Sequence, residues 1–226
     1  MTNLVLVGHG RMGQLVERWA GAHDCRIAGI VTDGSPAGSL RSHDFGEVDC
    51  AIDFSVATAV RTNLDAMASR GWNVVIGTTG WDHEGAACRE IVDRAGVGVL
   101  AAANFSMGMH VFRRVVQEAA RRFSSMPDVG AWIHESHHRA KKDAPSGTAL
   151  LLESAMIEVG YGRAVDVSST RAGSIPGTHE VGFDAAAETV TLTHTVRDRA
   201  VFAHGALEAA KWLKGRRGWF RMSYMF

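Results

Sequence analysis

The sequence predicts an α/β protein in which a parallel sheet covered by helices is followed by a second α+β region with a sheet of its own. Over residues 1–106, short apolar runs alternate with stretches of helical periodicity, which is the pattern of a doubly wound parallel sheet. A glycine-rich turn follows the first of these runs. After residue 106 the strand-like segments alternate apolar and polar residues, which indicates a sheet with one covered face.

In the first region, Leu4–Val7 is apolar and ends at Gly8, as expected for a buried parallel strand. A helix is expected over residues 12–22, because Leu15, Val16, Trp19 and Ala20 form an apolar stripe at helical spacing. Further strands are expected over residues 25–31, 49–54, 73–76 and 97–101, with helices over 57–70 and 84–95 between them.

In the second region, a helix over residues 107–123 is expected to lead into a strand over 129–135. Another helix opens near Ser146, and strands follow over 165–170, 178–183 and 189–196. Val190-Thr191-Leu192-Thr193 illustrates their alternation. Residues 202–213 are expected to form a terminal amphipathic helix.

The charge and cysteine content limit the possible partners and compartments. Basic and acidic residues number 24 each, and this balance disfavours nucleic acid and membrane surfaces, which attract an excess of positive charge. Cys25, Cys50 and Cys88 match no metal motif and lie in or beside apolar runs, so we expect reduced core thiols. With no leader-like start and no apolar run near the ~20 residues of a membrane span, the expected location is the cytoplasm.

The glycine turn predicts a dinucleotide site and hence a Rossmann-like first domain. Its sequence, Gly8-His9-Gly10-Arg11-Met12-Gly13, fits G-x-G-x-x-G between a predicted strand and a predicted helix. The first glycine permits the tight turn, the second lets backbone approach a pyrophosphate, and the third lets helix pack on strand. Free N–H groups and the helix dipole then favour the phosphates.

Other residues extend this predicted site. Asp33 closes the second strand, where a carboxylate accepts hydrogen bonds from ribose hydroxyls, although Asp followed by Gly is also typical of a solvated turn. Arg41 is a possible contact for a 2′-phosphate. Two further loops follow predicted strands and are expected at the carboxyl edge of the sheet, although both also fit ordinary polar turns. They are Gly77-Thr78-Thr79-Gly80 and Ala103-Asn104-Phe105-Ser106.

Residues 135–149 contain a second cluster of side chains that could bind or react with a small molecule. They read Glu-Ser-His-His-Arg-Ala-Lys-Lys-Asp-Ala-Pro-Ser-Gly-Thr-Ala. Two imidazoles and several cations precede a predicted helix start, whose amides at Gly147 and Thr148, beside Lys141, suit a carboxylate. An imidazole there can deliver a proton near neutral pH. Two alternatives remain on the residues alone: a metal site of His134, His137 and His138 with Glu135, or a polar loop.

This segment resembles the signature of the dihydrodipicolinate reductase family, His-His-x-x-Lys-x-Asp-x-Pro-Ser-Gly-Thr-Ala, at every fixed position. Other segments are also similar to the family, in the same order along nearly the whole chain. They are residues 75–80, 102–106, 171–173, 176–179 and 199–206.

The resemblance implies a reductase of lysine and diaminopimelate biosynthesis, which transfers hydride from NADH, NADPH or both to the cyclic imine derived from 4-hydroxy-tetrahydrodipicolinate. His137 is then the general acid, Lys141 and His138 bind the small dicarboxylate substrate, and Gly147 and Thr148 hold one of its carboxylates. Arg199 joins the cofactor side. The implied architecture is a dinucleotide-binding domain over 1–106 and 203–226, and a domain over 107–202 with a mixed sheet for substrate binding and oligomerisation, in a homotetramer.

The chain departs from the commoner family pattern in its tighter glycine turn, in its short segment between Asp33 and Asp49, and in its tail, residues 219–226. Two other functions compete with the reductase. A related amino- or imino-acid dehydrogenase, similar to aspartate dehydrogenase, needs the glycine turn without the full His-His-x-x-Lys run. A non-catalytic dinucleotide-binding sensor is favoured where His137 or Lys141 is missing, and both are present.

Overall fold

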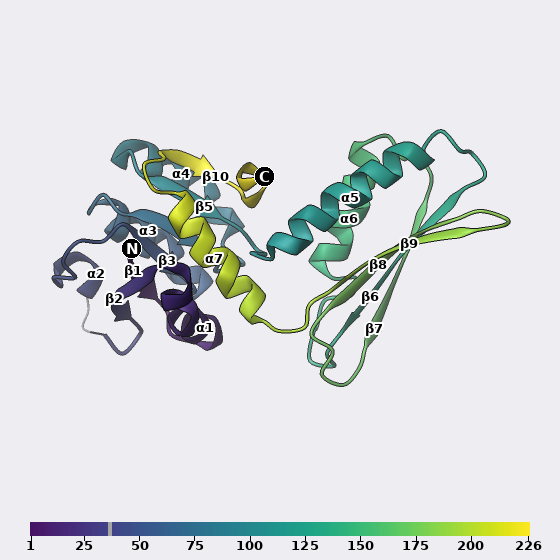
Figure 1. Ribbon diagram of the computed structural model, residues 1–226. Coiled ribbons are helices and arrows are strands. Elements are labelled where there is room, and N and C mark those ends of the chain that lie inside the picture. The colour runs from purple at the N-terminus through teal and green to yellow at the C-terminus, as the bar shows by residue number, and fades with distance from the viewer. Residues whose placement is uncertain (36–37) are drawn as a thin grey trace. The chain divides into compact units, whose positions relative to one another are not determined.

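The computed structural model describes residues 1–35 and 38–226, and the chain divides into two compact units. The first unit comprises Met1–Ser106 and Ala200–Phe226, and the second comprises Met107–Arg199. The chain therefore leaves the first unit once and returns to it (Figure 1). The return lies at Ala200, three residues before the predicted boundary at residue 203, because helix α7 (Ala200–Trp212) begins there.

The first unit contains a parallel sheet with the strand order β10-β5-β4-β3-β1-β2. Its strands are β1 (Thr2–Val7), β2 (Cys25–Val31), β3 (Cys50–Asp53), β4 (Asn73–Ile76), β5 (Gly98–Ala101) and β10 (Gly218–Phe220). From β1 the chain adds β2 on one side and then β3 on the other. The carboxyl ends of β1 and β3 therefore flank the point where strand order reverses, which is where ligands bind in such sheets.

Helices cover both faces of this sheet (Figure 1). Helix α1 (Arg11–Ala20) packs with α7 on one face, and α3 (Val60–Ala68) packs with α4 (Gly85–Ala95) on the other. Apolar strand residues such as Val5 and Val74 form a core with Leu64 and Met67 of α3. Short elements complete the unit: α2 (Ser39–Ser42) and the 3₁₀ turns η1 (Gly21–His23), η2 (Ala57–Ala59), η3 (Asp82–Glu84) and η4 (Met222–Met225).

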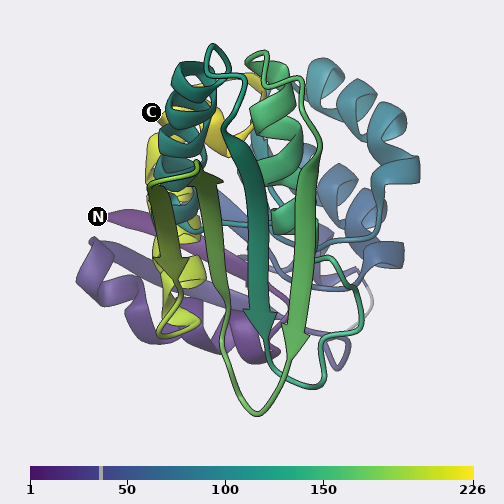
Figure 2. The same cartoon turned by 90° about the vertical axis from the view of Figure 1, so that its right-hand side faces the viewer.

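The second unit contains a mixed sheet with the order β7-β6-β8-β9. Its elements are β6 (Gly130–His137), β7 (Val165–Arg171), β8 (Thr178–Asp184), β9 (Thr189–Thr195), α5 (Met107–Phe123) and α6 (Gly147–Glu158). Strands β6 and β7 are parallel, whereas β8 runs antiparallel to both β6 and β9. Both helices lie on one face, where Ile133, Val181 and Phe183 pack against Val116 and Leu152. Figure 2 shows the sheet from the uncovered face.

Several elements differ from the sequence-based expectation. Strand β6 continues past the predicted end at Glu135 to His137, because its pairing with β7 persists to Arg171. Strand β10 and helix α2 were not predicted, and each is too short to show a period. The tail packs within the first unit, where Met222 is buried and the ring of Phe220 contacts that of Trp212.

Among the residues that the structure describes, no helix is both long enough and apolar enough to cross a membrane. The three cysteines are free thiols and buried. Burial raises the pKa of the Cys25 and Cys88 thiols and raises that of Cys50 well above its usual range, so all three behave as protonated core residues.

Candidate active site

The glycine turn has the shape that a bound dinucleotide requires. Gly8 has φ +88°, and a Cβ there would lie 2.4 Å from the carbonyl oxygen of Phe54. A Cβ on Gly13 would lie 2.3 Å from the carbonyl oxygen of Gly8. Beside Gly10, the N-cap residue of α1, no described atom comes within 4 Å of that position. Gly8 and Gly13 therefore let α1 pack on the turn, and Gly10 leaves open the helix end where phosphates fit.

A groove of about 640 Å³ opens beside this turn. It is lined by the predicted residues Gly8, His9, Gly10 and Asp33. Asp33 is exposed, and its Oδ1 accepts a hydrogen bond of 3.0 Å from the backbone N–H of the next residue. The carboxylate thus lies at the wall of the groove, as a contact to ribose requires.

Two of the predicted cofactor-side residues, His9 and Arg41, already pair with carboxylates. The Nε2 of His9 lies 2.7 Å from Oε2 of Glu17 on α1. Arg11 and Met12 form the first turn of α1. Arg41, the possible 2′-phosphate contact, lies in α2 and pairs with Asp65 at 2.5 Å between Nη2 and Oδ2. Arg41 would have to leave this exposed pair to reach a phosphate.

A fully buried carboxylate that the sequence analysis missed organises the loops around the groove. Asp53 ends β3 and is 0% exposed. Its Oδ1 accepts hydrogen bonds from the backbone N–H and hydroxyl of Ser55 at 2.8 and 2.6 Å, and from Thr78 Oγ1 at 2.9 Å. Its Oδ2 accepts one from Asn63 Nδ2 at 3.2 Å. Asp53 therefore joins the loop after β3 to the loop after β4.

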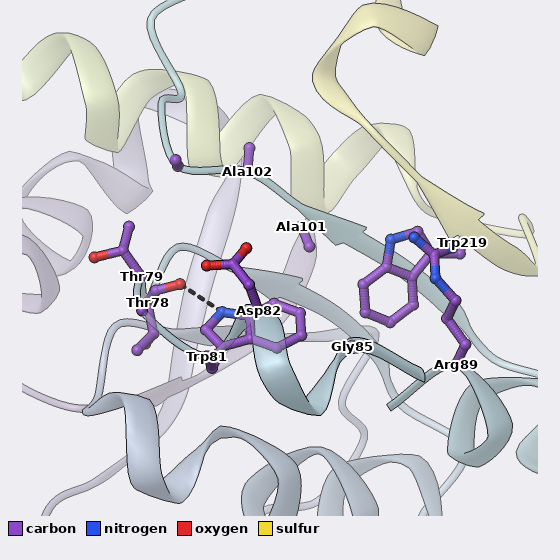
Figure 3. A pocket seen from close by; sticks show the side chains of 11 residues that line it. Thr78, Thr79, Trp81, Asp82, Gly85, Arg89, Ala101, Ala102 and Trp219 are labelled. Carbon is purple, nitrogen blue, oxygen red and sulfur yellow. Dashed lines mark hydrogen bonds between the residues drawn. The ribbon is translucent and has the colours of Figure 1, made fainter. Parts of the chain in front are cut away.

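A smaller cavity of about 260 Å³ lies at the ends of β4 and β5 (Figure 3). Thr78, Thr79 and Ala103, all predicted, line it together with Trp81 and Trp219, which were not. The indole N–H of Trp81 donates to the carbonyl oxygen of Thr78 at 2.7 Å, which holds this loop against the cavity. The adjacent Gly77 is a packing position, because a Cβ there would lie 2.0 Å from the ring of Phe54.

The run from Ala103 to Ser106 divides between cavity and interior. Phe105 and Ser106 are 2% and 1% exposed. The ring of Phe105 packs edge-on against that of Phe54, and its carbonyl oxygen would lie 1.8 Å from a Cβ on Gly205 of α7. The side chain of Asn104 accepts a hydrogen bond of 2.8 Å from the N–H of Ser106. Ala103 is thus the member of this run on the cavity wall.

Arg199, the remaining predicted cofactor residue, is exposed and is the last residue of the second unit.

In the second unit, an ion-pair cluster lies at the carboxyl end of β6, on the face covered by helices. Glu135 is 0% exposed. Its Oε2 hydrogen-bonds to Nδ1 of His137, and both carboxylate oxygens pair with the guanidinium of Arg171 at 2.5 and 2.9 Å. The backbone N–H of Ser146 donates to its Oε1 at 3.1 Å. The ring of His179, on β8, lies edge-on to that of His137 with centroids 5.1 Å apart.

The charges in this cluster are set by burial and by these partners. Burial alone would raise the pKa of Glu135, but hydrogen bonds from Arg171, Ser169 and His137 outweigh it and lower its pKa to about 2. Burial lowers the pKa of His137, and the carboxylate of Glu135 opposes this shift. Burial and the neighbouring His137 lower the pKa of His179 to about 4, so His179 is neutral at physiological pH.

The predicted carboxylate site lies at the amino end of α6, the next helix after this strand. Helix α6 begins at Gly147, with Ser146 as its N-cap and Thr148 in its first turn. The Ser146 hydroxyl accepts from the N–H of Ala149 at 3.2 Å, which leaves the amides of Gly147 and Thr148 outside the helical hydrogen-bond pattern.

Lys141 is also engaged at this helix end. Its ammonium pairs with both oxygens of Asp143 at 2.8 and 2.9 Å. Asp143 also hydrogen-bonds to the backbone of Gly147, so its carboxylate contacts the two groups expected to bind substrate. His138 lies in the same turn, where its carbonyl oxygen accepts from the N–H of Lys141 at 3.0 Å.

The alternative metal site proposed from sequence is not assembled. His134 points to the opposite face of β6 from Glu135 and His137, because successive side chains of a strand alternate. It contacts Ser168 on the neighbouring strand instead, at 2.9 Å between Nδ1 and Oγ. Glu135, His137 and His179 do bring potential ligand atoms within 4.8 Å of one another. Both oxygens of Glu135 already pair with Arg171, however, so the cluster is built as an ion-pair network.

Two of the residues that sequence reasoning missed have partners far from them in the sequence. Arg171 and His179 reach the cluster from β7 and β8, and both stand in the segments that resemble the family. That resemblance was the signal that could have indicated them. Asp53 had a weaker signal, as a charged residue that ends an apolar strand.

Comparison with known protein families agrees with this architecture over almost the whole chain. The family model described as "Dihydrodipicolinate reductase, N-terminus" matches residues 2–105, and "Dihydrodipicolinate reductase, C-terminus" matches residues 108–226. A relative named 4-hydroxy-tetrahydrodipicolinate reductase from Christiangramia forsetii is 35% identical, with 97% of this chain and 95% of the relative covered. One of the same name from Methanoculleus marisnigri is 39% identical, with 74% of this chain and 71% of the relative covered.

Solved structures agree on the fold. A dipicolinate-bound dihydrodipicolinate reductase from Paenisporosarcina sp. TG-14 superposes with a TM-score of 0.78 at 20% identity, covering 100% of both chains. A probable dehydrogenase from Thermotoga maritima gives a TM-score of 0.63 at 9% identity, covering 94% of this chain and 87% of the other. At these identities the likeness concerns the fold.

Proposed function

This chain belongs to the dihydrodipicolinate reductase family, and on that premise we propose how its residues carry out the reaction. It is an NAD(P)H-dependent 4-hydroxy-tetrahydrodipicolinate reductase of lysine and diaminopimelate biosynthesis. The products are tetrahydrodipicolinate, NAD(P)⁺ and water. One observation carries the assignment of residues: a buried carboxylate, Glu135, holds the imidazole of His137. The loop that follows His137 contains Lys141 and leads to the amino end of α6.

The second unit binds the substrate through its carboxylates. One carboxylate accepts hydrogen bonds from the backbone N–H groups of Gly147 and Thr148, and the ammonium of Lys141 pairs with the same carboxylate. To bind there, the substrate exchanges places with Asp143, whose carboxylate contacts Lys141 and Gly147. His138, in the same turn, contributes a further polar contact. These groups fix the ring so that its reacting carbon and nitrogen are held in one orientation.

His137 supplies the proton. Loss of water from the 4-hydroxy compound leaves a conjugated imine, and addition of hydride at its far end places negative charge on the ring nitrogen. The imidazolium of His137 gives its Nε2 proton to that nitrogen, while Nδ1 remains bonded to Glu135. A bound nicotinamide supplies the hydride.

The first unit holds the cofactor. Gly8, Gly10 and Gly13 shape the turn for the pyrophosphate, with the backbone of His9, Arg11 and Met12 around it. Thr78, Thr79 and Ala103 border the nicotinamide side, with Gly77, Asn104, Phe105 and Ser106 shaping that wall from behind. Arg199, directly before α7, is assigned to the same side by the family resemblance.

We assign the ribose contact to Asp33, so NADH works at least as well as NADPH, whose 2′-phosphate the carboxylate repels. An Asp33→Ser variant should raise kcat/KM for NADPH relative to NADH. A strong native preference for NADPH that persists in the variant would place the choice of cofactor on Arg41 or another cation.

We also propose that the chain works as a homotetramer in the cytoplasm. The uncovered face of the β7-β6-β8-β9 sheet offers the self-association surface, because a sheet that is covered on one face leaves the other accessible to a second sheet. Light scattering after size-exclusion chromatography measures the oligomer directly, and a monomer at micromolar concentration would reject this assignment.

The assignment of residues is tested by following nicotinamide oxidation with substrate made in situ from pyruvate and aspartate semialdehyde. His137→Gln should lower kcat by roughly 10²–10⁴, the range for a lost general acid. Lys141→Ala should lower kcat and raise KM together. His134→Gln is the matched control, because it removes an imidazole from the opposite face of the same strand and should keep the native kcat. Because that face is also the proposed self-association surface, light scattering should first show that the variant keeps the native oligomer.

Binding provides a second test. Pyridine-2,6-dicarboxylate should compete with substrate, and pyridine-2-carboxylate should bind several-fold more weakly because one charge-assisted contact, ~1.5–3 kcal/mol, is lost. Equal inhibition by the two compounds would favour a dehydrogenase for a monocarboxylate substrate.

A further inference from the structure

Glu135 enters the mechanism above only as the partner of Nδ1 of His137, yet it is among the most completely bonded groups of the second unit. Glu135 is fully buried and accepts from His137, from both terminal nitrogens of Arg171 and from the backbone of Ser146. A buried carboxylate needs such partners, because charge is costly to remove from water. Three of these partners would satisfy it without an imidazole.

The hydrogen bond to Glu135 selects one nitrogen of His137. A carboxylate with a pKa of about 2 is ionised near neutral pH and can only accept, so the proton of the bond resides on Nδ1. The neutral ring is then the Nδ1–H tautomer, and Nε2 is the nitrogen that gains and loses a proton.

The His137 side chain is partly exposed, with 12% of its surface accessible. Gly177 lies beside it, and a Cβ at that position would come within 3.2 Å of Nε2. The ring of His179 lies edge-on to the imidazole, with centroids 5.1 Å apart. The carboxylate, the glycine and the neighbouring ring therefore all contact or border the ring of His137.

We propose that Glu135 is a positioning residue that fixes the tautomer and direction of His137, with Arg171 as its counter-charge. This inference rests on the proposed role of His137 as proton donor. In effect the second unit carries a carboxylate–imidazole pair in which Glu135 keeps Nδ1 bonded and Nε2 directed to the substrate. Arg171 keeps the carboxylate ionised and ties the pair to the substrate loop, since its Nη2 also donates to the carbonyl oxygen of Asp143 at 2.6 Å.

The charges that face His137 make the proposal measurable. Glu135, on the same strand, raises its pKa, whereas Arg171 on β7 and Lys141 in the following loop lower it. His179 on β8 is neutral. Glu135→Gln and Arg171→Gln therefore break the same ion pair but should move the pKa of His137 in opposite directions, down in the first variant and up in the second. General loosening of the unit would move both in one direction.

The experiment is an NMR titration of ¹⁵N-labelled histidine side chains in the full chain without substrate, with the His137 signals assigned by their loss in His137→Gln. The native ring should be the Nδ1–H tautomer. Glu135→Gln should shift the neutral ring toward Nε2–H, and Arg171→Gln should retain Nδ1–H. Glu188→Gln, which removes an exposed carboxylate from the β8–β9 turn, is the matched control and should change neither quantity.

Kinetics on the same variants complete the test. Glu135→Gln should lower kcat by roughly 10²–10⁴, by analogy with the loss when the carboxylate behind a catalytic histidine becomes an amide. Its KM for substrate should change far less, because Lys141 and the α6 amides bind the carboxylates. If Glu135→Gln fails to fold with an unpaired Arg171, the double variant Glu135→Gln/Arg171→Gln removes both charges and should still lose the Nδ1–H tautomer.

Each outcome bears on the inference. A tautomer shift with a loss of kcat supports it. A loss of kcat with an unchanged tautomer would overturn it, because Glu135 would then act on the fold alone. A tautomer shift with a native kcat would overturn the catalytic part of the inference, whereas the role of His137 as proton donor is tested separately by kcat of His137→Gln.

Discussion

Two glycines of the same turn should respond in opposite ways to alanine. In Gly13→Ala the new Cβ would lie 2.3 Å from the carbonyl oxygen of Gly8, about 1 Å inside the 3.4 Å at which ordinary contact begins. Because the obstacle is backbone, helix α1 has to move away from the turn. Overpacking of this kind costs ~1–3 kcal/mol, and alanine's better helix propensity returns ~1 kcal/mol. We expect an overpacking cost at the upper end of this range, so the free energy of unfolding should fall by a net ~2 kcal/mol.

Gly10→Ala should leave stability nearly unchanged. No described atom lies within 4 Å of the new Cβ, and φ −72° suits alanine. The weaker N-cap costs ~0.5–1 kcal/mol, and the stiffer unfolded chain returns ~0.4–1 kcal/mol. The methyl group instead occupies the space assigned to the pyrophosphate. The Kd for NADH should therefore rise at least ~10-fold, which corresponds to about 1.4 kcal/mol.

The assay pairs urea unfolding, followed by circular dichroism, with titration of NADH followed by tryptophan fluorescence. The expected pattern is a destabilised Gly13→Ala variant and a stable Gly10→Ala variant that binds NADH weakly. A Gly10→Ala variant that binds NADH with the native Kd would refute the assignment of this helix end to the cofactor. Native stability in Gly13→Ala would refute the packing argument.

Three further predictions concern single side chains. Asp143→Asn should lower the Kd for pyridine-2,6-dicarboxylate about 1.5- to 5-fold in calorimetry. The reason is that the exposed ion pair between Asp143 and Lys141, worth ~0.2–1 kcal/mol, no longer competes with the ligand. A higher Kd would contradict the proposal that substrate takes the place of the Asp143 carboxylate. Burial lowers the pKa of His179 from 6.5 to about 4. Between these pH values the imidazole is protonated in the unfolded chain but neutral in the folded chain, so the free energy of unfolding should fall as pH drops from 6.5 to 4. This loss reaches about 3 kcal/mol, and His179→Gln should flatten it in urea titrations; an unchanged slope would assign it to other groups. In Asp53→Asn an amide replaces the carboxylate that accepts hydrogen bonds from Ser55 and Thr78, which weakens the link between the two loops and should raise the Kd for NADH roughly 10-fold. A native Kd would show that these loops need no carboxylate.

Periodicity predicted the elements well wherever a segment was long and regular. Strands 25–31 and 73–76 and helix 107–123 have the bounds that the sequence predicted. The glycine turn could also be predicted from the sequence, because its motif is local. The structure shows that a Cβ would meet different surroundings at each of the three glycines. The run of residues 137–149 indicated its chemistry in the same local way, through spacing and resemblance.

The tertiary structure decided which of the clustered side chains act together. In the sequence His134, Glu135, His137 and His138 look like one group, but β6 places His134 on one face and Glu135 and His137 on the other, and His138 lies beyond the end of the strand. The extension of β6 to His137 brings Arg171 to Glu135, across a gap of 36 residues. Asp53 similarly gains its partner Thr78 through the pairing of β3 with β4. The sequence alone determined the fold class and indicated the candidate reacting groups, because helix and strand periods and turn chemistry act between near neighbours. Strand register relates residues far apart in the chain, and it settled the partners of Glu135 and Asp53 once the sheets had formed.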